Sequence, residues 1–278
     1  MSTSQPIPQP QPTPSETRMV TPIEVLYPDA GDLHLRIAEG ACRLNIAPGT
    51  SDAWIRGSQR DPSGLRPLHV SQEGGTVRLS EQPTTSGVWD WLRAGHGFAD
   101  VPAIDLALGT AKPFRLTVEI GASENRLDLG GVPLSRLTVR HGAGKTAIDF
   151  SSPNPQPMTL MEIGAGAGST ELRNLANAHA AEILVEGGMA SYTLDFGGIL
   201  QQDTHTRITA ALSSVEITVP ATTAARISTE SPLGHVELGD GFTAKEGAFW
   251  TPAAVEGRTP TLTISANVTL GSLSLRVS

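Results

Sequence analysis

The sequence has little lysine, little charge and a single cysteine. Lysine occurs three times in 278 residues, charged residues make up 17 %, and the net charge is −8. Nucleic-acid binding needs a clustered cationic surface, so this composition argues against nucleic acid as a partner. One cysteine, Cys42, excludes an intramolecular disulfide and any metal site built from several thiolates. We expect Cys42 to be a small, buried, apolar side chain.

Long apolar runs are also missing. No stretch of 18 apolar residues occurs, and the N-terminus has neither a basic segment nor an apolar core of the secretory type. We therefore predict no transmembrane helix and a cytoplasmic protein. Residues 1–22 consist mainly of Pro, Gln, Ser and Thr, which favours a disordered tail. Residues 23–278 are predicted to form one β-solenoid domain.

What the chain has in abundance is glycine, proline and short alternating apolar runs. A unit recurs nine times from Leu33 to the C-terminus: an alternating run, a turn of small residues, then a second alternating run. Equivalent first runs are spaced by 21, 24, 22, 23 and 19 residues. A period near 20 residues is typical of stacked rungs that bury a shared core. The positions used for this spacing are Val118, Val139, Ile163, Val185, Ile208 and Ile227.

The glycines between paired runs have a structural explanation. The segments 142–144, 164–168 and 187–188 are GAG, GAGAG and GG. Glycine supplies positive φ, and its lack of a side chain lets neighbouring rungs approach closely. The main alternative is a series of β-hairpins, because two runs around a glycine turn also describe a hairpin.

No pattern in the sequence predicts an active site. Residues 141–146, HGAGKT, lack the first glycine of a P-loop and precede a strand-like run, and the GAGAG segment lacks the third glycine of a dinucleotide loop. The seven histidines show no metal-binding spacing. Asp149, Glu171 and Asp195 end equivalent second runs, so a carboxylate ladder of the polysaccharide-lyase or hydrolase type is the best enzyme alternative. We predict a non-enzymatic protein without catalytic residues, cofactor or metal.

Two segments, 82–105 and 241–256, interrupt the repeat and hold three of the four tryptophans. One interpretation is that they cover the ends of the stack, as solenoids require. The other is an aromatic contact surface for a partner or a sugar. The residues of this predicted interaction surface are Trp89, Trp91, Phe98, Phe249 and Trp250.

Residues 89–150, from WDWLRAG through PFRLTVEIGASENRLDL to HGAGKTAIDF, and the closing FWTPAAVEGRTPTLTISANVTLGSLSLRV resemble the LiaF-like toastrack family, also catalogued as "putative adhesin" domains of unknown function. The resemblance covers roughly residues 85–278. It implies a single-stranded, right-handed β-helix-like stack. It also implies a regulatory interaction with a membrane histidine-kinase system that responds to cell-envelope stress. Those regulators usually carry transmembrane helices before the stack, whereas this chain has a Pro-rich tail.

These observations together predict a scaffold that binds a protein partner, such as a membrane signalling protein, through its faces or strand edges. Two alternatives stay open at this point. One is a self-assembling structural protein of the bactofilin type, which also combines a β-solenoid with disordered tails. The other is a carbohydrate-binding or adhesin module. The oligomeric state is not predicted.

Overall fold

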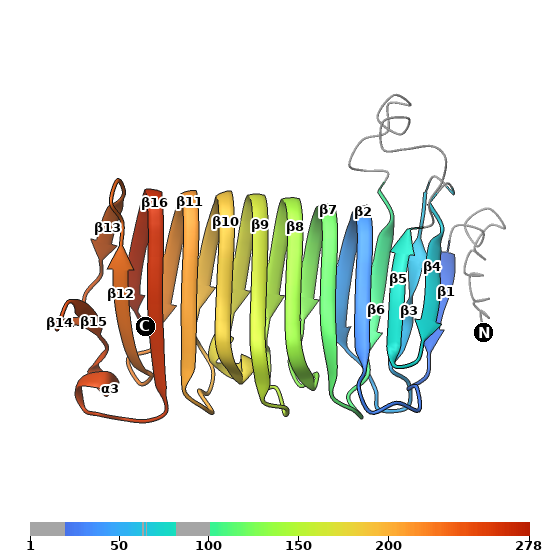
Figure 1. Ribbon diagram of the computed structural model, residues 1–278, viewed down its shortest axis with the longest axis horizontal. Helices are drawn as coiled ribbons and strands as arrows, with labels where there is room; N and C mark the ends of the chain where they lie inside the picture. The colour runs from blue at the N-terminus through green and yellow to red at the C-terminus, as the bar shows by residue number, and fades with distance from the viewer. Residues whose placement is uncertain (1–19, 63, 65, 82–100) are drawn as a thin grey trace, which may run out of the picture.

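The computed structural model describes residues 20–62, 64, 66–81 and 101–278. Its strands lie side by side in one elongated stack, with the first strands at one end and the last at the other (Figure 1). One 16-stranded sheet contains them all. The predicted all-β stack of rungs is confirmed. The first strand, β1 (Val20–Val25), begins inside the segment 1–22 that was expected to be a tail.

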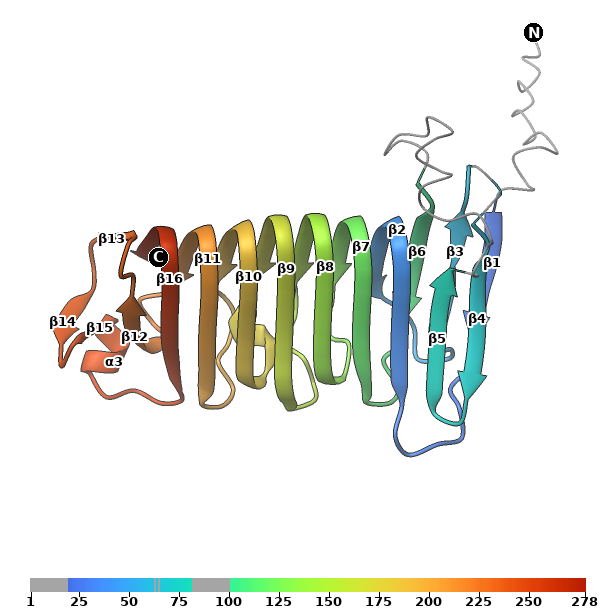
Figure 2. The ribbon, with the colours of Figure 1, turned by 45° about the horizontal axis from the view of Figure 1, so that its top comes forward.

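The middle of the stack consists of single long strands that pair in parallel and in sequence order. Each strand bends over one long edge of the stack, so that it contributes one half-rung to each face (Figure 2). These strands are β2 (His34–Pro48), β7 (Phe114–Asp128), β8 (Leu134–Asp149), β9 (Met158–Arg173), β10 (Ala180–Asp195) and β11 (Thr204–Val219). A short 3-10 helix, η2 (Leu175–Ala178), lies between β9 and β10.

The core lies between the two faces and is built from columns of aliphatic side chains. Val118, Val139, Ile163, Val185 and Ile208 are in register on adjacent strands, and all five are buried. Because successive strand residues point to opposite faces, every second residue joins such a column. No rung could bury this surface alone, so the neighbouring rungs stabilise one another.

The glycines lie at the bends, for the two reasons that were predicted. Gly144 and Gly168 have φ of 126° and 121°, which a side chain rarely adopts. A Cβ on Gly168 would also lie 1.9 Å from the carbonyl oxygen of Gly144. Gly142 and Gly166 lack the positive φ but allow close approach, since a Cβ on Gly166 would lie 2.4 Å from the oxygen of Gly142. The glycines therefore let the rungs stack closely where each strand bends.

At the N-terminal end, two strands together form the rung outside β2. β5 (Thr76–Glu81) and β6 (Ala103–Leu108) pair in parallel with its first and second halves. β4 (Leu68–Glu73) then covers β5, β3 (Ile55–Arg60) covers β6, and β1 covers β3, all antiparallel. The unit at residues 68–80 was predicted to be a rung. It is the β4–β5 hairpin instead, which turns at Gly74 with φ of 55°.

At the C-terminal end, the strands do not follow the sequence order that the repeat predicted. The last strand, β16 (Thr261–Val277), lies between β11 and an outer rung formed by β12 (Ala224–Glu230) and β13 (His235–Leu238) (Figure 1). Ile227 pairs with Ile264, which pairs with Thr206, so the predicted equivalence of Ile227 with Ile208 is wrong by two residues. Of the remaining elements, β15 (Ala248–Trp250) pairs with β12, β14 (Thr243–Lys245) pairs with β15, and helix α3 (Pro252–Val255) contacts β12.

Candidate interaction surfaces

The aromatic residues of segment 241–256 form part of the C-terminal end of the stack. Phe249 pairs with Ile227 of β12 and packs against the core, where its ring makes an edge-to-face contact with Phe242 at 6.5 Å. Trp250 is half-buried, and the Lys245 ammonium lies over its ring, 4.8 Å from the centroid. This segment therefore covers the outer edge of β12, as a cap does.

The other predicted surface residues, Trp89, Trp91 and Phe98, lie outside the described residues. The strands that flank them in the sequence, β5 and β6, belong to the N-terminal end of the stack, whereas β15 belongs to the opposite end (Figure 1). The strands next to the two aromatic segments therefore lie at opposite ends of the stack.

A row of large, exposed apolar side chains runs along the bends of the C-terminal rungs. Leu212 of β11 pairs with Leu270 of β16. The pairing around them places Met189 of β10 beside Leu212 and Leu233 beside Leu270. Their exposed fractions are 63 % for Met189, 55 % for Leu212, 41 % for Leu270 and 71 % for Leu233. We call these four residues the apolar ridge.

The N-terminal rungs show that the fold does not require these side chains. Ala122, Ala143 and Ala167 are paired in the same column, and Ala167 pairs with Met189. The column thus changes from alanine to large apolar residues at β10. From Ala122 to Leu212, each residue of this column lies four positions after the aligned core residue of its strand, so the spacing of the runs already contains the column.

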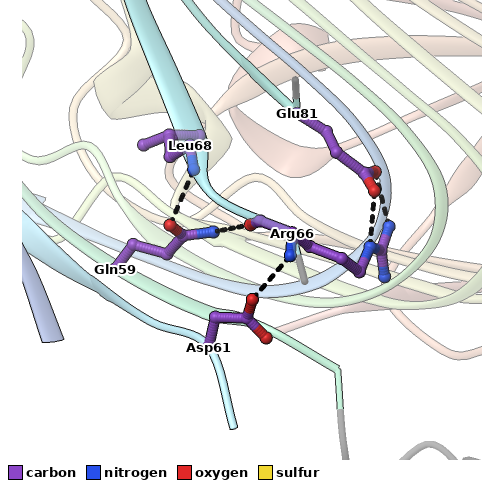
Figure 3. A network of polar contacts seen from close by, with 5 residues as sticks. All are labelled: Gln59, Asp61, Arg66, Leu68 and Glu81. Carbon is purple, nitrogen blue, oxygen red and sulfur yellow. Dashed lines mark hydrogen bonds and ion pairs between the residues drawn. The ribbon is translucent and has the colours of Figure 1, made fainter. Parts of the chain in front are cut away.

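The N-terminal end contains a buried polar network (Figure 3). The Arg66 guanidinium donates two hydrogen bonds of 2.6 Å to the Glu81 carboxylate. Asp61 accepts the Arg66 backbone N–H at 2.7 Å, and the Gln59 amide bridges the Arg66 carbonyl and the Leu68 N–H at 2.8 Å each. These bonds fix the segment between β3 and β4 over the end of the core.

Glu39 lies in the bend of β2 beside this network. It is buried, its Oε1 has no hydrogen-bond partner, and a Cβ on neighbouring Gly40 would lie 3.3 Å from both Arg66 and Glu81. Burial, followed by repulsion from Glu81, raises the pKa of Glu39 to about 7. Cys42 is a buried free thiol, as expected, and burial raises its pKa to about 12.

The carboxylates of the enzyme alternative do not form the expected ladder. Asp149 pairs with Arg173, whereas Glu171 pairs with Ala147 and Thr193. Asp149 and Asp195 each bind a polar group of a following turn, because Asp149 accepts from Asn174 at 2.7 Å and Asp195 from the Gly197 N–H at 3.1 Å. The Asp149 and Asp195 carboxylates therefore stabilise turns at the ends of the rungs.

A shallow depression between β2, β3 and β6 contains one carboxylate, that of Asp105, which accepts a hydrogen bond from Asn45 at 2.6 Å. Glycoside cleavage of the usual kind needs two carboxylates. Within the described residues, no group of three or more His, Cys, Asp or Glu side chains is arranged to hold a metal ion. Nor is any helix of this part of the chain long and apolar enough to cross a membrane.

One solved structure shares this fold over nearly the whole chain. A cell adhesion protein of Clostridium sporogenes ATCC 15579, described as "putative", has a similar structure with a TM-score of 0.50 and 13 % identity, over 93 % of this chain and 99 % of that one. A "putative adhesin" of Bacteroides fragilis NCTC 9343 gives a TM-score of 0.38 and 10 % identity, over 92 % and 95 % of the two chains. No curated protein matches the chain.

The family model described as the N-terminal domain of toast_rack, DUF2154, matches residues 11–160. This range includes the polar network, the N-terminal caps and the first long rungs. It covers more than half of the chain, and so the protein belongs to the toast_rack family.

Proposed function

We propose that this protein is a non-enzymatic scaffold that binds a protein partner along the apolar ridge. The observation that carries the proposal is the register of the ridge: four large apolar side chains are exposed at adjacent bends, where the preceding rungs have alanine. Contiguous exposed apolar surface on a soluble domain is typical of an interaction site. The buried polar groups and separated carboxylates described above support a non-enzymatic role.

The spacing of the ridge fits a helix on the partner. Adjacent strands lie about 4.8 Å apart, so neighbouring ridge side chains repeat at about this distance. Apolar residues three and four apart on a helix lie about 5–6 Å from each other. An amphipathic helix lying along the bends would therefore place one apolar side chain near each ridge residue.

We assign this interaction to cell-envelope stress sensing in the cytoplasm, with a membrane signalling protein as the partner. The resemblance to LiaF-like regulators supports the assignment, and the bent stack supplies a rigid row of side chains for such a contact. A sugar-binding role for Trp250 has less support, because Lys245 and Arg226 lie over its ring at 4.8 and 5.6 Å. End-to-end polymerisation has less support too, since Pro22 lies in the outermost N-terminal strand.

Affinity purification of the full chain from its native cells would test the proposal. We expect a membrane signalling protein to co-purify and to be lost when Leu212→Glu is introduced. Ile199→Glu is the matched control, because Ile199 is also exposed but lies outside the ridge. Equal recovery of the signalling protein with both variants, or its absence from the unmodified sample, would refute the assignment.

A further inference from the structure

The two ends of the stack differ in how completely they are covered. Each end presents two half-rungs: β5 and β6 at the N-terminus, and β12 and β13 at the C-terminus. Antiparallel strands cover three of them, β4 on β5, β3 on β6 and β15 on β12. Within the described part of the chain, β13 pairs only with β16. No strand of the described residues covers the outer edge of this fourth half-rung.

The apolar core is exposed at this same half-rung. Leu238 pairs with Leu275, which pairs with Ile217, and both of these partners are buried. Leu238 ends this core column and is 43 % exposed. Val236 ends the neighbouring column and is half-buried, whereas its partner Leu273 is fully buried. One further strand against β13 would bury both side chains.

The outer backbone edge of β13 is suited to strand pairing. The Gly239 N–H donates to the Leu275 carbonyl at 2.8 Å, so this residue faces β16. Backbone groups alternate along a strand, which means that the N–H and C=O groups of Val236 and Leu238 face outward. Exposed edges are often protected by proline or lysine. The sequence of β13, HVEL, has neither, whereas β1 at the other end contains Pro22.

The charge around this edge indicates what kind of strand it accepts. Glu237 and Asp240 are both exposed, and among the described residues neither has an ion-pair partner. Arg276 of β16 lies beside Gly239 but forms an ion pair with Glu216 at 3.1 Å. Lys245 and Arg226 lie over the Trp250 ring beside β12. A strand that brings basic side chains next to Glu237 would therefore add a favourable cross-strand pair.

We propose that β13 is completed by an antiparallel strand from a different polypeptide, an extended segment in which aliphatic and basic residues alternate. Its aliphatic side chains cover Val236 and Leu238, and its basic side chains lie near Glu237 and Asp240. A second copy of this chain fits less well. The antiparallel register that pairs Val236 with Leu238 in both directions places the two Glu237 side chains opposite each other, which is destabilising.

This inference goes beyond the proposed function, because it concerns a surface other than the bend that carries the ridge contact. It is tested with the full chain and a short fluorescent peptide of alternating valine and lysine. Fluorescence anisotropy measures binding, and ¹⁵N NMR spectra of the chain locate it. We expect saturable binding that shifts the amide resonances of Val236 and Leu238. A peptide with the same sequence but N-methylated at alternate residues is expected not to bind.

Two substitutions separate strand pairing from unspecific attraction of a basic peptide. Leu238→Ser removes apolar area at the edge and is expected to weaken binding about tenfold. Val255→Ser is the matched control, since Val255 is 51 % exposed on α3 and is expected to leave binding unchanged. The ridge variant Leu212→Glu is also expected to bind the peptide normally, so a failed ridge assignment would leave this result intact.

Three outcomes would overturn the inference. The first is the absence of saturable binding. The second is equal binding of the N-methylated peptide or of Leu238→Ser, which would indicate charge attraction without strand pairing. The third is a dimer of the free chain, detected by analytical ultracentrifugation and abolished by Leu238→Ser, which would identify a second copy as the occupant.

Discussion

Replacing Glu39 with glutamine is expected to stabilise the protein at alkaline pH and to have little effect below pH 4.5. The carboxylate is buried in the bend of β2, and its pKa is raised from 4.5 to about 7. The folded chain therefore binds this proton more tightly than the unfolded chain does. By linkage, the free energy of unfolding is largest below pH 4.5, decreases as the pH rises towards 7, and is constant above that value as far as this group is concerned.

The size of the effect follows from the same pKa. A displacement from 4.5 to about 7, at about 1.36 kcal/mol per pH unit, corresponds to about 3 kcal/mol. Glutamine has the shape of glutamate and no charge at any pH. It should recover most of this free energy at pH 8. Since Glu39 Oε1 accepts no hydrogen bond, the substitution breaks none at that atom.

Urea unfolding followed by circular dichroism between pH 4 and pH 8.5 would measure the effect. The difference between Glu39→Gln and the unmodified chain should grow from near zero to about 3 kcal/mol over this range. Glu73→Gln is the control, because Glu73 is exposed on β4 and should give a small difference at every pH. A Glu39→Gln protein that is equally stable or less stable at pH 8 would refute the reasoning.

Three further predictions concern a glycine at a bend, a buried thiol and a buried histidine. Gly168→Ala should destabilise the chain by about 2–4 kcal/mol in urea unfolding, because its Cβ would meet the Gly144 carbonyl, whereas Gly31→Ala, with open space around it, should not. The Cys42 thiol should resist a thiol reagent at pH 8 in the native protein and react once urea unfolds it; fast labelling of the native chain would contradict its burial. Burial lowers the pKa of His141, so unfolding free energy should decrease as the pH falls below 6.5, and His141→Gln should reduce this dependence; an unchanged pH profile would argue against it.

The repeat predicted the middle of the stack because the sequence of each rung there shows two alternating runs around one turn. Alternation in both runs, with a turn of glycine or other small residues between them, indicates one bent strand, and the column from Val118 to Ile208 follows that pattern. The same pattern failed at residues 68–80, since a hairpin and a rung share the local sequence of two runs around a glycine turn. In a hairpin the two runs pair with each other, whereas in a rung each run pairs with a neighbouring rung. The local sequence does not specify these pairing partners.

The position of β16 could not be predicted for a related reason. In a solenoid, the repeat specifies which residues face the core, but it does not specify which rung lies next to which. β16 and β12 both present alternating aliphatic residues, so either could lie against β11. β16 has 17 residues and pairs along almost the whole of β11, whereas β12 and β13 are shorter and interrupted. This longer, uninterrupted pairing explains why β16 and not β12 lies against β11.

The ridge was missed because its signal lies in the turns, where small residues were expected. Gly166 and Gly188 show why the bends are crowded: a Cβ on Gly188 would lie 2.9 Å from the Gly166 oxygen. The ridge residues stand beside these crowded positions and point away from the core, so their size is free to vary. The alignment of the runs, extended by four residues into the turns, would have shown alanine in the earlier units and large apolar residues in the later ones.

That freedom allows the function of the ridge to be separated from the stability of the fold. Replacing Met189, Leu212 and Leu270 together with alanine gives the C-terminal bends the residue that the column already has at Ala122, Ala143 and Ala167. Exposed substitutions of this kind usually change the free energy of unfolding by about 0.5 kcal/mol or less each. The triple variant should therefore unfold in urea near the unmodified chain while losing the partner in affinity purification. If it instead unfolds much more easily, the ridge contributes to packing, and its exposure is no evidence of binding.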